Sequence, residues 1–472
     1  MRSLCRTDII THPITIDRAA QLCYNRRYSP GSAAYAPRGG VGHADRSCSS
    51  ACRAIAGGGI VWTARGTGQA ATRPRTHVPV LSAHSPCTPK KGSKMKLTCL
   101  QEFLKKGLSI ANHAVASKST LPVLSNVLLA TDDGRLKIAA TNLEIGLNCW
   151  IGAKIETEGA ITVPAKLLSD YISGLPNDKI ALSLDARTQM LSIQCGNGFK
   201  ANMKGIEAEE FPSIPTIIDQ APTVSFAPDT LREAIDQVAF AAATDDTRPV
   251  FAGVLIRLRG TTATFAAADG YRLSLRTITL PEPVSEPHEV IVPARALQEL
   301  ARIIGDVEGP VHVTVTPSGG QILFHTEQMD LVSRLIEGKF PDVERIIPTN
   351  YATRTVLDTQ DLVKAVKLAS YFATASSNIV KLTMESGGEL QPGKLTISVN
   401  ASEVGDNVSA IDGMISGEGG QIALNVKFLS EALSAIKTPQ IALETQTPQS
   451  PGVFKPVGSE GYTHIVMPMT MR

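Results

Sequence analysis

Basic side chains recur at matching positions of three predicted helices, on the face opposite the apolar residues. In the helix predicted over residues 291–306, apolar residues recur at i, i+3, i+4 and i+7, which indicates one buried face. Arg302 lies on the opposite face, seven residues after another arginine. Each helix is therefore expected to present cations away from its own core. When the three segments are aligned, one equivalent position holds a cation in each: Lys166 in segment 161–175, Arg295 in segment 291–306 and Lys427 in segment 422–437.

Patterns typical of catalysis or metal binding are not recognisable in this sequence. Cys48 and Cys52 could begin a metal site, but no second cysteine pair or paired histidine follows at zinc spacing. Asp245 and Asp246 lie in a polar stretch without a third nearby carboxylate, which favours a solvated loop over a metal pair. The histidines after residue 94 are interpreted as satisfied structural or surface residues: His113, His288, His312, His325 and His464. We expect no catalytic residue, no metal and no cofactor.

The predicted helices belong to a unit that occurs three times along the chain. A further helix-like stretch begins at Leu100, Leu231 and Leu362, at intervals of 131 residues. Two more markers keep the same order: Asn142, Asp269 and Ala401 in turns, and Phe211 and Phe340 before a proline. Four markers in one order predict three tandem repeats. The predicted boundaries are 95–220, 221–350 and 351–472, with residues 1–94 outside the pattern.

Short alternating apolar runs fill the space between the helices of each repeat. Turn pairs such as Asp133-Gly134 and Gly319-Gly320 separate these runs, a pattern typical of antiparallel hairpins. Helices and hairpins together predict an α+β fold class, in which each repeat is long enough for its own core. No apolar run of about 18 residues occurs, so no membrane span is predicted.

The first 94 residues differ from the remainder in composition. They contain 14 of the 46 Lys and Arg residues, 3 of the 44 Asp and Glu residues and 5 of the 8 cysteines, so their net charge is +11 and that of the rest is −9. They could be an organellar transit peptide, a basic arm that binds nucleic acid, or the start of a metal site. The favoured interpretation is a disordered or mis-annotated extension, with translation beginning at Met95. Three scattered cysteines in the remainder indicate a reducing cytoplasm.

With the threefold repeat established, residues 95–472 resemble the bacterial DNA polymerase III beta subunit family, the sliding clamps. The segments that carry the resemblance are STLPVLSN (119–126), ATNLEI (140–145), TVPAKLL (162–168), EEFPSIP (209–215), ADGYRL (268–273), VIVPAR (290–295), LIEGKFPDVERIIP (335–348) and HIVMPM (464–469). The resemblance implies three DNA-clamp domains and a head-to-tail homodimer that closes into a ring. Two helices per repeat would line a central hole, with antiparallel sheets outside.

The resemblance implies three sets of functional residues. The DNA-binding set is Lys118, Lys166, Arg248, Arg295, Arg302 and Lys427. The partner-peptide cleft, between the second and third repeats, would contain Phe251, Gly270, Tyr271, Arg272, Leu273, Pro341, Arg345, Ile346, Ile465, Val466, Met467, Pro468 and Met469. The dimer interface would contain Phe199, Tyr371 and Phe372. The tail departs from the usual family ending, because Thr470 and Met471 precede Arg472.

The implied function is that of a non-enzymatic processivity factor that encircles double-stranded DNA without reading its sequence. A ring that encloses DNA needs only a moderate positive lining, which agrees with the net charge of −9 after residue 94. Implied partners are the DNA polymerase III alpha subunit, the clamp loader and repair polymerases. The polymerase and 3′-5′ exonuclease activities would reside in other subunits. Alternatives are a specialised or drug-insensitive paralogue with the same ring, and an enzyme whose site has no recognisable motif.

Overall fold

The computed structural model describes residues 94–116, 119–216, 221–245, 247–388 and 392–470, and every structural statement below concerns these residues. They lie in one compact unit, Ala83–Arg472. The interpretations of residues 1–93 and of Lys118 fall outside the described residues.

The first repeat begins with a strand that leads directly into a helix. Its helix α2 buries Leu104, Leu108 and Ala111, at the spacing of one helix face. Gly107 lies on this face, where a Cβ atom would come within 2.7 Å of Ile138 Cδ1, so glycine allows the helix to approach the sheet closely. The elements are β1 (Lys96–Leu100), α2 (Gln101–Asn112), η1 (Pro122–Ser125), β2 (Asn126–Asp132), β3 (Arg135–Thr141), β4 (Ile145–Gly152), β5 (Lys154–Thr157), β6 (Ala160–Pro164), α3 (Ala165–Gly174), β7 (Lys179–Asp185), β8 (Met190–Cys195), β9 (Phe199–Lys204) and η2 (Ala208–Glu210).

The second repeat contains the helix that the apolar spacing over residues 291–306 predicts. Leu297, Leu300 and Ile304 are buried, which confirms the predicted face. Pro293 is the last residue of β14, and α5 begins at Ala294. The elements are β10 (Val224–Phe226), α4 (Pro228–Val238), η3 (Ala239–Ala241), η4 (Pro249–Ala252), β11 (Gly253–Arg259), β12 (Thr262–Ala268), β13 (Arg272–Thr279), β14 (His288–Pro293), α5 (Ala294–Ile303), η5 (Ile304–Asp306), β15 (Val311–Val315), β16 (Gln321–His325) and β17 (Met329–Arg334).

The third repeat follows η6 (Val343–Arg345) and has the same order of strand, helix, hairpins and second helix. Its helix α6 begins with a side-chain cap, because Asp358 Oδ1 accepts hydrogen bonds from the backbone amides of Gln360 and Asp361 at 2.9 and 3.1 Å. The elements are β18 (Thr353–Asp358), α6 (Thr359–Thr374), β19 (Ile379–Glu385), β20 (Gly393–Ala401), β21 (Gly405–Gly417), β22 (Gly420–Asn425), α7 (Val426–Ala435), β23 (Gln440–Thr445), β24 (Gly452–Pro456) and β25 (Tyr462–Val466).

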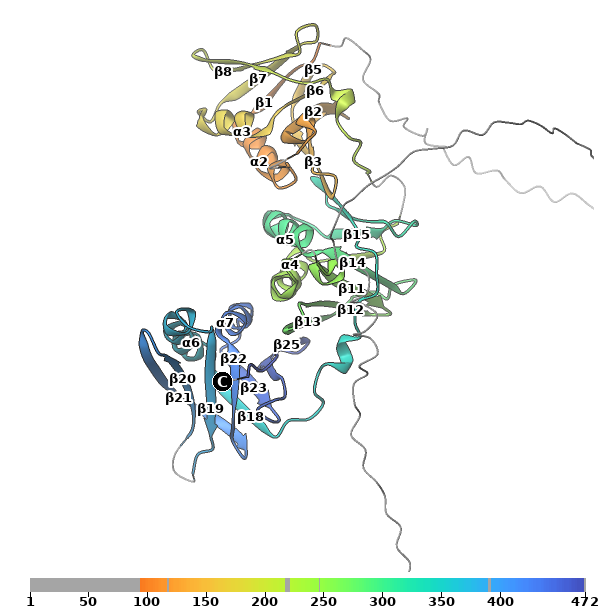
Figure 1. Cartoon of the computed structure of the whole chain (residues 1–472). Helices are drawn as coiled ribbons and strands as arrows, with labels where there is room; N and C mark the ends of the chain where they lie inside the picture. Colours follow the sequence, from red (N-terminus) through yellow and green to blue (C-terminus); the bar gives the residue numbers. More distant parts are fainter. Residues whose placement is uncertain (1–93, 117–118, 217–220, 246, 389–391, 471–472) are drawn as a thin grey trace, which may run out of the picture. The chain divides into compact units, whose positions relative to one another are not determined.

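The two helices of each repeat lie side by side, as α2 with α3, α4 with α5, and α6 with α7 (Figure 1). Every strand pair in the described residues is antiparallel, as the hairpin pattern predicts, and Asp133 and Gly134 both have positive φ in a hairpin turn. The sheet orders are β5-β1-β7-β8-β9, then β10-β15-β16-β17-β4-β3-β2-β6, then β14-β11-β12-β13-β25-β24-β23-β18-β21-β20-β19-β22.

Two of these sheets continue from one repeat into the next. Strand β17 of the second repeat pairs with β4 of the first, and β13 of the second repeat pairs with β25 of the third. Backbone hydrogen bonds therefore join neighbouring repeats directly. The second of these junctions, between β13 and β25, contains most of the predicted cleft residues.

Candidate functional site

A tight turn before β13 shapes the junction between the second and third repeats. Asp269 Oδ1 accepts hydrogen bonds from the backbone amides of Tyr271 and Arg272 at 2.8 and 3.0 Å. Gly270 between them has φ +93°, a conformation that glycine adopts without steric cost. This turn leaves Tyr271 60% exposed and directs Arg272 into the junction.

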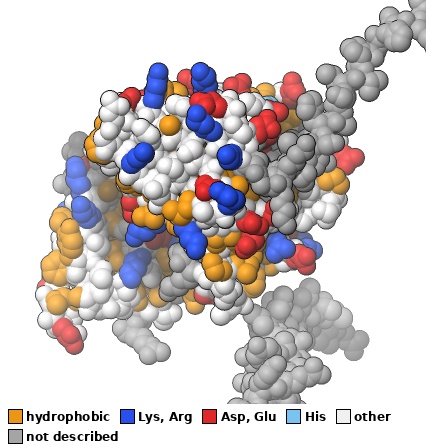
Figure 2. All heavy atoms as spheres, turned by 90° about the horizontal axis from the view of Figure 1, so that it is seen from above, with side chains coloured by type: hydrophobic (Ala, Val, Ile, Leu, Met, Phe, Trp, Pro, Cys, Tyr) orange, Lys and Arg blue, Asp and Glu red, His pale blue; other side chains and the backbone are white. Residues whose placement is uncertain are grey.

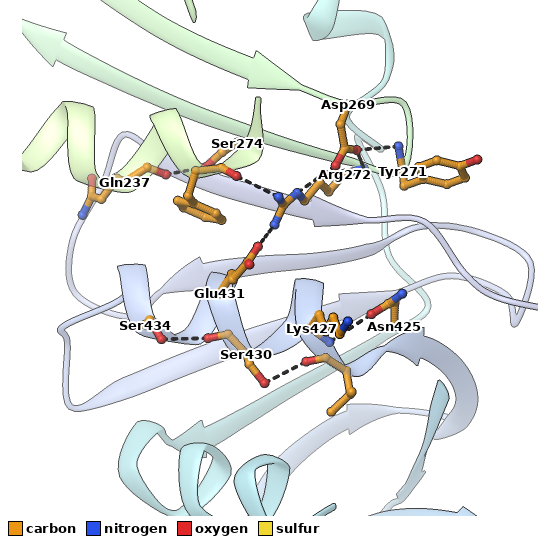
Figure 3. A network of polar contacts seen from close by, with 12 residues as sticks. Gln237, Asp269, Tyr271, Arg272, Ser274, Asn425, Lys427, Ser430, Glu431 and Ser434 are labelled. Carbon is orange, nitrogen blue, oxygen red and sulfur yellow. Dashed lines mark hydrogen bonds and ion pairs between the residues drawn. The ribbon is translucent and has the colours of Figure 1, made fainter. Parts of the chain in front are cut away.

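Arg272 links the two repeats through a network of polar contacts (Figure 3). Its Nε donates to Asp269 Oδ2 at 3.0 Å, its Nη2 donates to the Phe240 carbonyl at 2.7 Å, and its Nη1 pairs with Glu431 of α7. The guanidinium also lies over the Phe428 ring, 4.6 Å from the ring centroid. Arg272 is only 8% exposed, so its charge interacts with groups inside the junction and not with solvent.

An apolar cluster lies beneath this turn. Leu273 and Ile465 are buried in it, neighbours across the β13–β25 pair. Phe251 packs edge-on against Phe340 with 6.1 Å between ring centroids, so η4 and the segment after β17 contribute to the same cluster. Val466 instead packs into the core of the third repeat. The structure thus brings together predicted cleft residues that are as far apart in sequence as Phe251 and Ile465.

The end of the described chain is attached to this junction by backbone hydrogen bonds. Met467 donates its amide to the Tyr271 carbonyl at 2.8 Å, and Met469 donates to the Ala423 carbonyl at 2.8 Å. Tyr271, Ile346 and Met467 leave apolar surface exposed around the cluster, with Pro341, Pro468 and Met469 half-buried beside them. Arg345 is largely exposed and pairs with Asp342 at 3.0 Å.

Two further residues belong to this site although they are absent from the predicted cleft. Phe428 of α7 stacks on Tyr271 with ring centroids 6.4 Å apart. Arg248, predicted to bind DNA, donates from Nη2 to the Asp269 carbonyl at 2.9 Å and lies over the Phe251 ring at 5.0 Å. For Phe428 a signal exists in the sequence, because an aromatic residue directly follows the aligned cation of the third repeat. No sequence signal relates Arg248 to the turn.

His464 lies inside the junction without a hydrogen-bond partner. It is fully buried and stacks on Phe240 with 5.4 Å between ring centroids, and neither ring nitrogen has a partner in the described residues. The expectation that His464 is a satisfied histidine is therefore wrong. Burial, with a smaller contribution from the Arg272 charge, lowers the pKa of His464 to about 3, so the ring stays neutral near pH 7.

The aligned cations occupy the second residue of their helices, α3, α5 and α7, and all three are exposed: Lys166, Arg295 and Lys427. A positive charge in the first turn opposes the helix macrodipole, so these positions do not stabilise their helices. Arg302 is exposed but donates to both carboxylate oxygens of Glu299, at 2.8 and 3.0 Å. In the face seen in Figure 2, basic and acidic side chains are interspersed.

The predicted dimer residues lie on exposed parts of the first and third repeats. Phe199, 50% exposed, begins β9, which pairs with β8 only and forms one edge of its sheet. Tyr371 of α6 is 64% exposed, whereas Phe372 packs partly against the core of its repeat. In β21, residues 405–413 pair with β20 alone, so this part of the strand is a second open edge, and Val408 on it is exposed.

No helix among the described residues is long and apolar enough to cross a membrane. Over the same residues, no group of three or more His, Cys, Asp or Glu side chains could hold a metal ion.

Comparison with known proteins defines the class of this protein. The beta sliding clamp of Synechocystis sp. is 32% identical over 394 residues, which cover 80% of this chain and 100% of the relative, and that of Pseudomonas putida is 30% identical with the same coverage. The crystal structure of the Bacillus subtilis DNA polymerase sliding clamp superposes with a TM-score of 0.75 at 26% identity, over 80% of this chain and 100% of that chain. The fold is therefore that of the sliding clamps.

Family models resolve this class further. The DNA polymerase III beta subunit N-terminal, central and C-terminal domains match residues 95–215, 225–342 and 344–470. The chain belongs to the DNA polymerase III beta subunit family. The family resemblance read from the sequence is thereby confirmed.

Proposed function

We propose that this chain is a DNA polymerase processivity factor that forms a closed ring around duplex DNA as a head-to-tail homodimer. The observation that carries the proposal is the presence of all three family domains, in order, over residues 95–470. The clamp domains would extend over 95–220, 221–350 and 351–472. The chain itself would contribute no catalysis, and the polymerase and 3′-5′ exonuclease activities would belong to other subunits.

Exposed helix cations support the DNA-facing role. Lys166, Arg295 and Lys427 occupy equivalent positions in the three repeats, although a positive charge near a helix N-terminus interacts unfavourably with the helix dipole. A threefold set of isolated cations suits weak, sequence-independent attraction to phosphates. Arg302 would contribute less to DNA attraction, because its guanidinium forms an ion pair with Glu299. Arg248 would act mainly at the β13 turn.

Open strand edges support the dimer. Strand β9 in the first repeat and residues 405–413 of β21 in the third each have one unpaired edge. Exposed edges pair readily with another chain, and the apolar residues Phe199, Val408 and Tyr371 are exposed at or near them. A head-to-tail pairing of first and third repeats would cover both edges at two equivalent joints.

The junction around Tyr271 would bind short peptides from the polymerase III alpha subunit, the clamp loader and repair polymerases. Exposed Tyr271, Ile346 and Met467 surround a buried apolar cluster, and methionine adapts to several partners. Phe428 extends this surface onto α7. Arg272 and Asp269 would hold the surface in place without touching the peptide.

Topological retention on DNA tests the proposed function. The full chain, loaded on a nicked circular plasmid by its clamp loader, should remain bound during gel filtration in high salt. Cutting the plasmid once should release it, because a ring held by enclosure slides off a free end. Loss from the uncut circle in high salt would refute enclosure, since only charge attraction falls steeply with salt.

A further inference from the structure

The junction between the first and second repeats contains a groove that has no place in the proposed function. It has a volume of about 270 Å³ and lies between the turn before β4, the end of β17 and the linker over residues 212–215. Its apolar lining includes Leu143, Ile214, Val332 and two prolines, and its charged lining residues are Glu144 and Arg334.

The turn beside this groove repeats the turn of the second junction. Asn142 Oδ1 accepts from the amides of Glu144 and Ile145 at 3.0 and 2.8 Å, as Asp269 Oδ1 accepts from the two residues at its own i+2 and i+3 positions. The residue after the Asn or Asp has positive φ in both turns, +75° at Leu143 and +93° at Gly270. The two junctions therefore share one backbone frame.

The strand beyond each turn continues this equivalence. Arg334 donates its amide to the Glu144 carbonyl at 3.0 Å, as Met467 donates to the Tyr271 carbonyl at 2.8 Å. Strand β17 thus occupies beside β4 the place that β25 occupies beside β13. The backbone position held by Met467 in the second junction is held by the cation Arg334 in the first.

Packing against the core does not explain the position and backbone conformation of Leu143. It is 49% exposed, and its φ of +75° is a conformation that side chains bearing a Cβ atom seldom adopt. A strained, exposed apolar residue at the edge of a groove is typical of a contact surface. Opposite it, Ile214 covers Gly146, where a Cβ atom would come within 2.8 Å of Ile214 Cγ2.

Residues 213 and 214 form the linker side of the groove. Among the described residues, neither Ser213 nor Ile214 forms a backbone hydrogen bond, and Pro212 and Pro215 flank them. Prolines bias the preceding residues towards an extended conformation. Unpaired backbone groups beside an apolar groove suit an extended peptide more than a compact ligand.

We propose that this groove is a second peptide-binding site, which takes an extended partner segment with an aliphatic side chain next to an acidic one. The aliphatic group would contact Leu143 and Ile214, and the carboxylate would pair with Arg334, which forms no ion pair within the described residues. The inference rests on the proposed function, because the occupant is of the same kind as that proposed for the second junction. The difference in side chains makes the two sites selective for different segments.

The test uses the full chain labelled at isoleucine δ1 methyl groups, with the Ile214 resonance assigned by Ile214→Val. The probe is the peptide acetyl-Ala-Leu-Asp-Leu-Ala-amide, and the control peptide has Lys in place of Asp. A saturable shift of the Ile214 resonance with the acidic probe is expected. The lysine peptide should bind about fivefold more weakly, the upper range for an exposed ion pair.

Three variants separate the possible outcomes. Arg334→Glu should reverse the preference between the two peptides, and Leu143→Gly, which suits the positive φ, should abolish the shift without lowering the thermal midpoint. Deleting residues 467–472 removes part of the second junction and should leave the Ile214 response unchanged, even if the proposed function fails. The proposal would be overturned if no saturable shift appeared, or if the shift were unchanged by Arg334→Glu and Leu143→Gly. It would also be overturned if the shift depended on protein concentration alone, because the groove would then bind a second copy of the chain.

Discussion

Arg272 shows how one buried cation can stabilise a junction between repeats. Its partners come from three places in the sequence: Asp269 in its own turn, the Phe240 carbonyl after α4, and Glu431 on α7. Lysine retains the charge but cannot supply the same planar set of donors. The guanidinium geometry therefore adds side-chain contacts to the junction that the β13–β25 backbone pairing forms between the second and third repeats.

We predict that Arg272→Lys lowers the free energy of unfolding by about 2 kcal/mol, because hydrogen bonds to charged groups at a buried site are lost. Thermal unfolding of the full chain measures this effect. Arg345→Ala is the matched control, since Arg345 is 87% exposed and its pair with Asp342 should contribute less than about 1 kcal/mol. Equal losses for the two variants would contradict the assigned role of Arg272.

His464 gives the same junction a dependence on pH. Its pKa is lowered to about 3 in the folded chain, below the ordinary value of 6.5, so the unfolded chain binds the extra proton first as pH falls. Stability contributed by the neutral ring is complete above pH 6.5 and is lost between pH 6.5 and 3, by up to about 1.4 kcal/mol per pH unit.

We predict that His464→Leu flattens the decline of stability over this range, because leucine neither titrates nor leaves two ring nitrogens unpartnered. Denaturation midpoints measured from pH 7 to pH 4 for the parent and the variant test this. Parallel curves for the two proteins would show that another group governs the acid response.

At the scale of elements, α3, α5 and α7 begin with the same arrangement, a cation at the second helical residue. Lys427→Glu should stabilise α7 by about 0.3–1 kcal/mol through the helix dipole and weaken the attraction to duplex DNA. Lys394→Glu on strand β20 is the matched control for net charge, because that lysine is exposed in the same repeat. Thermal midpoints and the salt dependence of affinity for a short linear duplex check both parts. Equal loss of affinity in the two variants would mean that net charge alone matters.

The segment after β25 is the second element with a specific consequence. Hydrogen bonds from Met467 and Met469 attach it to the Tyr271 turn and to β22. Deleting residues 467–472 should leave the dimer intact and abolish both the binding of clamp-binding peptides and polymerase stimulation. Calorimetry with such a peptide and sedimentation of the same sample measure the two effects. Unchanged peptide affinity after the deletion would exclude this segment from the site.

Local patterns in the sequence were sufficient for the helices and hairpins. Apolar spacing identified the buried face of α5, and Asp133-Gly134 identified a hairpin turn. Contacts between distant residues could not be predicted in this way. Arg272 and Glu431 are 159 residues apart, and no local pattern of either segment indicates that they meet. The positive φ of Leu143 was equally unpredictable, because turns rarely place leucine there.

At the scale of the whole molecule, the proposed dimer would depend on side chains at two joints. We predict that Phe372→Ala gives monomers at concentrations where the parent is dimeric, since one substitution removes contacts at both joints. Tyr371→Ala, at a more exposed ring on the same helix, should act likewise without disturbing the core. Tyr351→Ala is a control at an exposed aromatic outside the proposed interface. An unchanged sedimentation coefficient for both α6 variants would remove this helix from the joint.

The sheets that run from one repeat into the next also determine where such a ring could open. To swing one repeat away from its neighbour, a run of adjacent backbone hydrogen bonds in the β4–β17 or β13–β25 pair must break together. At the proposed joint between chains, dissociation breaks no covalent connection and leaves every repeat junction intact. A circle of DNA without ends would therefore enter through an opened interface between the two chains. The junctions between repeats within each chain would stay closed during this step.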